Sequence, residues 1–194
     1  MGGALHPKDV SDWVTRLGAE PSIATTAAWS RWRAEVATYA VTFDALQPKR
    51  TAQERRDNWL DDYGKVLLRP RAAVERSVPE IEVVEASRVS GWVARWQDSF
   101  GAAPGWMKPW TSGTIPPSVA DTLKQVRAAS PEAKPWDVLA WRDGEVRFVE
   151  CKALSEKFTR AEQAFIWGAH KVGIALDCFA VVRGAIKYPE APSL

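Results

Sequence analysis

Apolar positions in the first part of the chain recur at helical spacing. The first such run is Val10, Trp13, Val14 and Leu17, and it stops at Gly18. The second comprises Trp29, Trp32, Val36, Tyr39, Ala40 and Phe43. Thr51 and Glu54 form a capping box that begins a third predicted helix, with Trp59, Leu60 and Tyr63 facing inward. This pattern predicts that residues 1–77 are a helical extension.

A longer helix is predicted over residues 80–99, after Pro79. Its apolar face comprises Ile81, Val84, Val89, Trp92, Val93 and Trp96. Glu85 falls near the middle of that face and Glu82 nearer its edge. A carboxylate that faces a core is costly unless it is paired, protonated or bound to metal. Glu85 therefore either pairs with a neighbouring group or belongs to a functional site.

The pattern changes in the second half of the chain, where short apolar runs alternate with helical segments. After a Gly-, Pro- and Trp-rich connection over 101–117, a short helix is expected over 118–128. Residues 137–141 and 145–151 read as strands around the turn Asp143-Gly144, a strong two-residue hairpin signal. A capping box at Thr159 and Glu162 begins a helix to about Lys171, and a strand follows over 174–182. Strands that alternate with helices predict an α/β fold.

The hairpin brings polar side chains together at one end. A turn at 143–144 pairs Arg142 with Glu145, and the same register places Asp137 directly opposite Glu150. Lys152 lies two residues beyond Glu150 and shares its face. The hairpin therefore predicts two neighbouring carboxylates with an amine beside them.

Two neighbouring carboxylates repel each other unless a positive charge lies between them. Lys152 alone could supply it, as a partly buried cluster of ion pairs. A divalent cation could also supply it, because Mg²⁺ is typically held by one or two carboxylates together with phosphate and water. Such an ion polarises a phosphate and activates a bound water, which is the chemistry of phosphodiester hydrolysis.

These residues resemble a known family. Pro135-Trp136-Asp137, followed on the next strand by Glu150-Cys151-Lys152, is similar to the signature of the PD-(D/E)XK nuclease superfamily. Gln163, in the helix that follows, makes the chain similar to the VRR-NUC branch, in which a glutamine lines the site. The resemblance covers residues 78–184.

The resemblance implies a restriction-endonuclease-like core, a small mixed sheet flanked by helices, over residues 78–194. It implies an enzyme that depends on Mg²⁺ or Mn²⁺ and hydrolyses DNA. The residues that it makes catalytic are Asp137, Glu150, Lys152 and Gln163. The positions that it assigns to the metal are Glu85, Asp137, Glu150 and Cys151, with Glu82 as the alternative carboxylate of the preceding helix.

Composition excludes several classes of protein. The chain has 194 residues, of which 46% are hydrophobic, so one packed domain with an extension is expected. Its two cysteines do not make a disulfide framework, and we expect a cytoplasmic protein. No apolar run is long enough for a membrane span, and no signal segment is evident. The net charge of +2 says little about partners, so nucleic-acid binding would need a local basic patch.

Three functions remain open from the sequence. The first is a nuclease, with selectivity for DNA structure and a role in repair, recombination, restriction or phage biology left undecided. The second is a catalytically silent module of the same fold that binds nucleic acid or protein. The third is an interaction protein built on its eleven tryptophans, which could stack on bases or simply fill a core. A homodimer is also left open.

Overall fold

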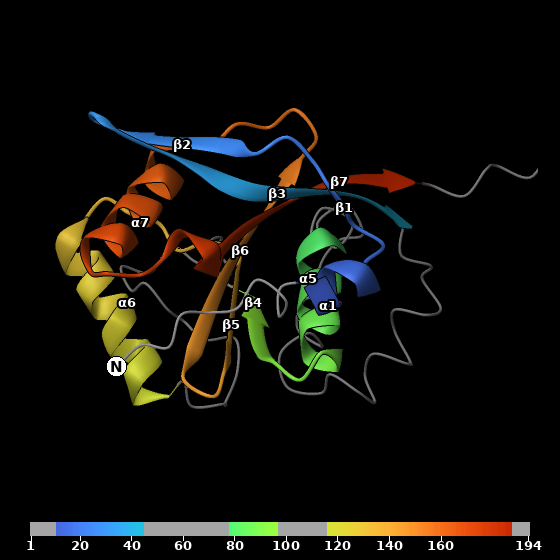
Figure 1. Cartoon of the computed structure of the whole chain (residues 1–194), viewed down its shortest axis with the longest axis horizontal. Helices are drawn as coiled ribbons and strands as arrows, with labels where there is room; N and C mark the ends of the chain where they lie inside the picture. The colour runs from blue at the N-terminus through green and yellow to red at the C-terminus, as the bar shows by residue number, and fades with distance from the viewer. Residues whose placement is uncertain (1–10, 45–77, 97–115, 188–194) are drawn as a thin grey trace, which may run out of the picture.

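A computed structural model describes residues 11–44, 78–96 and 116–187 of the chain (Figure 1). The helices are α1 (Ser11–Arg16), α5 (Val78–Val89), α6 (Pro117–Ala129), α7 (Arg160–Lys171) and the short 3-10 helix η2 (Leu176–Cys178). The strands are β1 (Glu20–Pro21), β2 (Thr25–Trp29), β3 (Trp32–Asp44), β4 (Val93–Trp96), β5 (Val138–Arg142), β6 (Glu145–Ala153) and β7 (Phe179–Lys187). None of these helices is both long and apolar enough to cross a membrane.

The strands form a mixed sheet of seven strands. Their order is β1-β3-β7-β6-β5-β4, and β2 pairs with β3 beside this path. The pairs β3–β7 and β6–β7 are parallel, and the other pairs are antiparallel. The α/β class and a mixed sheet flanked by helices are therefore confirmed.

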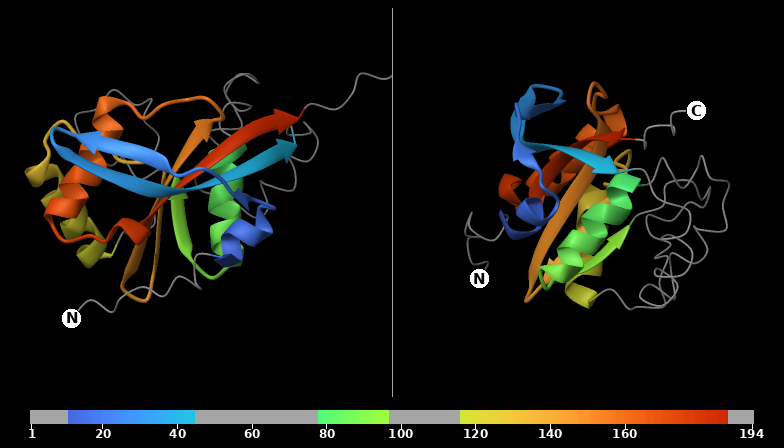
Figure 2. Two further views of the ribbon diagram at one scale, coloured as in Figure 1. Left: turned by 45° about the horizontal axis from the view of Figure 1, so that its top comes forward. Right: turned by 90° about the vertical axis from the view of Figure 1, so that its right-hand side faces the viewer.

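Helices cover both faces of the sheet. On one face, α1 and α5 pack against a core that includes Trp13, Ile81 and Val149. On the other face, α6 and α7 lie side by side over a core that includes Phe148 and Phe165 (Figure 2). Successive residues of a strand point to opposite faces, so β6 sends Phe148 to one core and Val149 to the other.

The predicted β5–β6 hairpin is confirmed with its register. Arg142 pairs with Glu145, and the pairing runs on to Val138 and Val149. Asp143 and Gly144 both have positive φ, 50° and 85°, as a two-residue hairpin turn of this type requires. The turn chemistry therefore sets the register of the whole hairpin.

The predicted helix over residues 29–43 is wrong. These residues form the end of β2 and most of β3, and β3 pairs with β2 over residues 32–36 and with β7 over residues 37–44. The buried face of the strand changes along its length. Val36 packs in the core under α7, whereas Val41 and Phe43 pack in the core beside α5, and Glu35 and Thr42 are exposed. Successive residues of a strand point to opposite faces, so this change interrupts the two-residue repeat of apolar positions and leaves spacings of three and four residues that resemble those of a helix. The extension is thus not all helical, and the sheet joins residues on both sides of the expected boundary at 77.

The predicted helix over 80–99 is too long. Helix α5 ends at Val89, and Gly91 takes a φ of 86°, which ends a helix readily. Val93 and Trp96 then begin and end β4, an antiparallel neighbour of β5. The sequence pattern assigned the apolar residues of α5 and β4 to one helix, although Gly91 separates the two elements.

The other predictions differ little from the structure where it describes them. Helix α1 ends before Gly18, whose φ is 62°, and α6 buries Val119, Leu123 and Val126 as expected. The last strand begins at Phe179 rather than at 174, because η2 precedes it. The predicted helix at Thr51 and the connection over 101–115 lie outside the described residues.

The close contact between α6 and α7 gives a stability prediction. A Cβ added at Gly168 would lie 2.9 Å from the Val126 carbonyl oxygen and 2.8 Å from Ser130 Cβ. We expect Gly168→Ala to cost about 1–3 kcal/mol in the free energy of urea unfolding, because backbone atoms cannot yield cheaply. An uncrowded helical glycine would instead gain up to about 1 kcal/mol from this substitution, so a stabilised variant would contradict the packing.

Candidate active site

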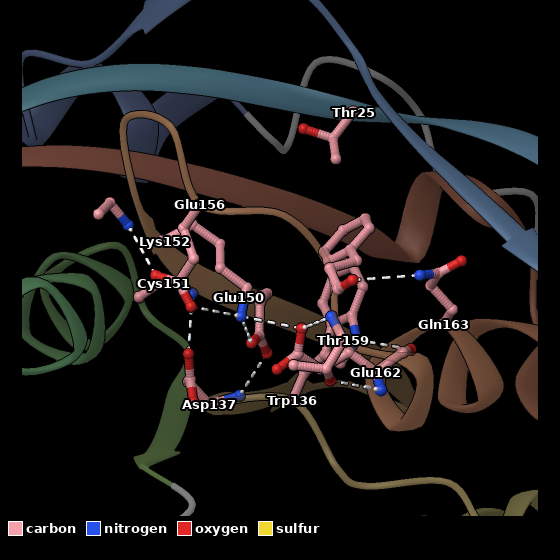
Figure 3. Close-up of polar contacts among 12 residues, drawn as sticks. Thr25, Trp136, Asp137, Glu150, Cys151, Lys152, Glu156, Thr159, Glu162 and Gln163 are labelled. Carbon is pink, nitrogen blue, oxygen red and sulfur yellow. Dashed lines mark hydrogen bonds and ion pairs between the residues drawn. The ribbon is translucent and has the colours of Figure 1, made fainter.

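Two hydrogen bonds join Asp137 to β6 just beyond the last paired residues of the hairpin. The Asp137 N–H donates to Glu150 Oε2 at 3.2 Å, and the Cys151 N–H donates to Asp137 Oδ2 at 2.9 Å. Asp137 and Glu150 are therefore neighbours, as the predicted register requires (Figure 3).

Lys152 forms ion pairs with three glutamates. Its Nζ lies 2.9 Å from Glu150 Oε1, 2.8 Å from Glu162 Oε2 and 3.2 Å from Glu156 Oε1. The side chains of Lys152, Glu150 and Glu162 are 3–5% exposed, whereas that of Glu156 is 49% exposed. We call Asp137, Glu150, Lys152, Glu156 and Glu162 the Lys152 cluster.

The start of helix α7 holds Glu162 in place. The Thr159 N–H donates to Glu162 Oε2 at 2.9 Å, and the Glu162 N–H donates to Thr159 Oγ1, which completes the predicted capping box. Trp136 Nε1 donates to the Glu162 carbonyl at 3.3 Å. The oxygen that caps the helix thus also pairs with Lys152, a second role that the sequence did not reveal.

Arg183 fixes the loop between β6 and α7. Its Nη1 donates to the carbonyls of Ala153, Leu154 and Glu156, at 3.0, 3.3 and 2.6 Å. Its Nη2 donates to Thr25 Oγ1 at 3.3 Å. The loop that carries Glu156 is therefore tied to β7 and to β2.

The electrostatics of the cluster follow from burial and from an excess of acid. Burial raises the pKa of Asp137 to about 6, although the Cys151 N–H opposes the rise. Burial, and then the Asp137 charge, raise the pKa of Glu150. Burial disfavours the charged form of Lys152, but Glu150 and Glu162 outweigh it and raise its pKa. Hydrogen bonds from Lys152 and Thr159 outweigh the burial of Glu162 and lower its pKa.

The carboxylate that α5 contributes is Glu80. Burial, and then the Asp137 charge, raise the pKa of Glu80 from 4.5 to about 8, and its Oε2 is buried without a hydrogen-bond partner. Sequence reasoning chose Glu85, with Glu82 as the alternative. Five residues turn a helix by about 500°, so Glu85 points about 140° away from Glu80 and the two cannot face one site. Glu80 follows Pro79 in the first turn of α5. An acid is common at this position because its negative charge interacts favourably with the helix dipole.

Gln163 lies apart from Asp137, on the far side of Glu162 (Figure 3). Its Oε1 accepts from the Ala28 N–H at 3.1 Å, and its Nε2 donates to the Phe158 carbonyl at 3.1 Å. Both ends of the amide thus tie α7 to β2 and to the preceding loop. The structure gives Gln163 this role in place of a contact with the cluster, and its expected part in catalysis stays a prediction.

The donors of this region suit a hard divalent cation. Glu150 and Glu162 supply carboxylate oxygens to Lys152, Asp137 lies beside Glu150, and Glu80 Oε2 is a buried acceptor without a hydrogen-bond partner. In the part of the chain that the structure describes, no three His, Cys, Asp or Glu side chains are gathered as metal ligands.

Cys151, the remaining predicted metal position, has a protonated thiol in the metal-free protein. Burial raises the pKa of the Cys151 thiol, and the neighbouring acids add to the rise, so the thiol stays protonated. Its side chain packs against the core beside α5, while its N–H binds Asp137. Only the carbonyl oxygen of Cys151 remains as a donor for a hard cation.

Comparison with known proteins gave no match to a family model, to a curated protein or to a solved structure.

The buried ion pairs predict a large effect on stability. Lys152→Met leaves Glu150 and Glu162 buried without their cation, and we expect a loss of about 3–5 kcal/mol in the free energy of unfolding. Lys124→Met is the matched control, because the Lys124–Asp121 pair is 77% and 61% exposed and should contribute at most about 1 kcal/mol. Equal losses in the two variants would show that the Lys152 pairs do not hold the fold together.

The raised pKa of Glu80 predicts a pH dependence in metal-free buffer. The folded protein holds this proton more tightly than the unfolded chain, so stability falls as the pH rises from about 5 to about 8. Glu80→Gln cannot titrate, and its stability relative to the wild type should therefore increase across that window. Urea unfolding at several pH values measures the difference.

The exposed acid Glu132 provides the control for this pH series. Glu132→Gln makes the same substitution at an exposed site outside the Lys152 cluster, and its unfolding is measured beside that of Glu80→Gln. If the stability of Glu80→Gln relative to the wild type stayed constant or fell as the pH rose, folding would not raise the pKa of Glu80.

Proposed function

We propose that the protein is a metal-dependent nuclease that hydrolyses DNA phosphodiester bonds. The observation that carries the proposal is the neighbouring pair of carboxylates, half-buried Asp137 and buried Glu150, with Lys152 beside Glu150 and Glu80 near enough for the Asp137 charge to raise its pKa. Buried acids that outnumber their cations are costly, and functional sites are where such clusters are retained.

The carboxylate and carbonyl donors suggest which residues would bind the metal and which would orient the attacking water. Glu80, Asp137 and Glu150, with the Cys151 carbonyl, would hold Mg²⁺ or Mn²⁺. Such an ion lowers the pKa of a bound water and polarises a phosphoryl oxygen. The carboxylates of this chain would orient that water and set its hydrogen bonds.

Lys152 would serve as a positive charge rather than as a base. Its raised pKa keeps the amine protonated at neutral pH, so it has no lone pair to accept a proton from water. Its ammonium group would stabilise the negative charge that grows on the phosphate oxygens in the transition state.

DNA is proposed as the substrate from the resemblance of Asp137 and Glu150-Cys151-Lys152 to the PD-(D/E)XK signature. The alternative is a nuclease-like fold that binds nucleic acid or protein without cutting. One observation favours that alternative: the ammonium group of Lys152 is already shared by three glutamates. Cleavage and metal binding distinguish the two.

The test is a cleavage panel with Mg²⁺ or Mn²⁺ over supercoiled, linear, branched and single-stranded DNA. We expect Asp137→Asn and Lys152→Gln each to reduce the rate by about 100-fold or more, because each removes a charge that acts on the transition state. Glu132→Gln, an exposed acid outside the cluster, should cleave like the wild type.

Metal binding is measured separately by thermal unfolding. Mn²⁺ at millimolar concentration should raise the melting temperature of the wild type by mass action, and raise those of Asp137→Asn and Glu80→Gln less. No cleavage of any substrate, together with equal shifts in all three proteins, would leave the Lys152 cluster a structural set of ion pairs and refute the proposal.

A further inference from the structure

A stack of aromatic rings links the β2–β3 hairpin to the last turn of α7. The ring centroids of Trp32 and His170 lie 5.4 Å apart with an interplanar angle of 29°, and those of Trp32 and Trp167 lie 5.5 Å apart. Both tryptophans are partly buried, and Trp32 packs against the core under α7, whereas His170 is exposed. The stack therefore runs from that core out to solvent, where it ends on an imidazole ring.

One face of α7 makes these contacts with the hairpin. Its residues are three or four positions apart and so lie on the same side of the helix: Arg160, Gln163, Trp167 and His170. Gln163 accepts from the Ala28 N–H, and the guanidinium carbon of Arg160 lies 5.3 Å from the centre of the Trp29 ring. The tip of the hairpin therefore lies along this face of α7 (Figure 2).

A cation lies at each end of the stack. Arg160 lies over the ring of Trp29, and Lys171 Nζ lies 5.3 Å from the centre of the Trp167 ring. Both cationic side chains belong to exposed residues at opposite ends of α7. An aromatic face attracts a cation, which holds these long side chains close to the rings. Positive charge is thus available on both sides of the exposed imidazole.

The hairpin over residues 25–36 and helix α7 contain more cations than acids. The cations are Arg31, Arg33, Arg160 and Lys171, and the acids are Glu35 and Glu162. Glu162 is buried and pairs with Lys152. Glu35 is exposed on the face of β3 opposite to Trp32, because successive residues of a strand alternate. Neither acid of these two elements therefore faces the aromatic stack.

Aromatic rings beside exposed cations are typical of surfaces that bind single-stranded nucleic acid, where bases stack on the rings and the cations contact phosphates. We propose that His170, with Arg160 and Lys171, forms a surface that binds single-stranded DNA. An unpaired base stacks on the imidazole ring, and the two cations contact the neighbouring phosphates. The bases of a duplex already stack on one another, so the surface selects single strands.

Helix α7 joins this surface to the Lys152 cluster. Glu162 pairs with Lys152, and His170 lies eight residues further along, about 12 Å along the helix axis. A strand held at His170 is thus a few nucleotides from the cluster. The choice of DNA rests on the proposed function, whereas the stacking surface itself does not.

The test is fluorescence anisotropy of a labelled oligothymidine with the full chain in EDTA, where metal-dependent cleavage cannot occur. The wild type should bind saturably. His170→Ala should bind at least about fivefold more weakly, the equivalent of one lost base stack, whereas His170→Phe keeps a ring and should bind as tightly as the wild type. His170 is exposed, so both variants should fold, and their melting temperatures check this.

A second pair of variants tests the phosphate contacts. Lys171→Gln should bind more weakly than the wild type at low salt, and the difference should shrink as the salt concentration rises. Lys187→Gln is the matched control, because Lys187 is also exposed but lies at the far end of β7, away from α7 (Figure 1).

Three comparisons of ligands can overturn the inference. An abasic strand of the same length carries the same phosphates, and its equal affinity for the wild type would rule out stacking. A duplex that binds as tightly as the single strand would rule out the selection of single strands. Tighter binding of oligouridine would rule out DNA as the ligand. A wild type that binds oligothymidine in EDTA but cuts no DNA with metal would refute only the proposed nuclease.

Discussion

One ammonium group joins the parts of the chain that make the candidate site. Lys152 pairs with Glu150 on its own strand, with Glu156 in the following loop and with Glu162 on α7. The pairs with Glu150 and Glu162 are almost fully buried, so water screens them little and removing the cation would leave two costly charges. The position of α7 against the hairpin therefore depends on this lysine.

The shared lysine does not balance all the acid around it. Burial raises the pKa of Asp137, of Glu150 and of Glu80, which means that the fold disfavours their charged forms. A protein that keeps such groups near one another loses stability at neutral pH unless a cation or protons compensate. The proposed metal gives this arrangement a physical reason, since a divalent ion would balance the charges that Lys152 cannot.

The local part of the fold and of the site could be predicted from the sequence. Asp143 and Gly144 determine the turn, the turn determines the register, and the register brings Asp137 to Glu150 without any knowledge of distant contacts. The capping box at Thr159 is equally local. These features follow from residues a few positions apart, where turn and cap chemistry decide the backbone.

The sequence predictions that were wrong concern residues whose structure depends on contacts between distant segments. β3 is a strand because β2 and β7 pair with it, and the change of its buried face between Val36 and Val41 made its pattern look helical. Glu80 looked like an ordinary acid at a helix start, since only the position of α5 against the sheet brings it near Asp137. The most direct measurement is a crystal structure with Mn²⁺, located by its anomalous scattering. We expect the ion between Glu80, Asp137 and Glu150, and an ion bound only elsewhere would contradict the assignment.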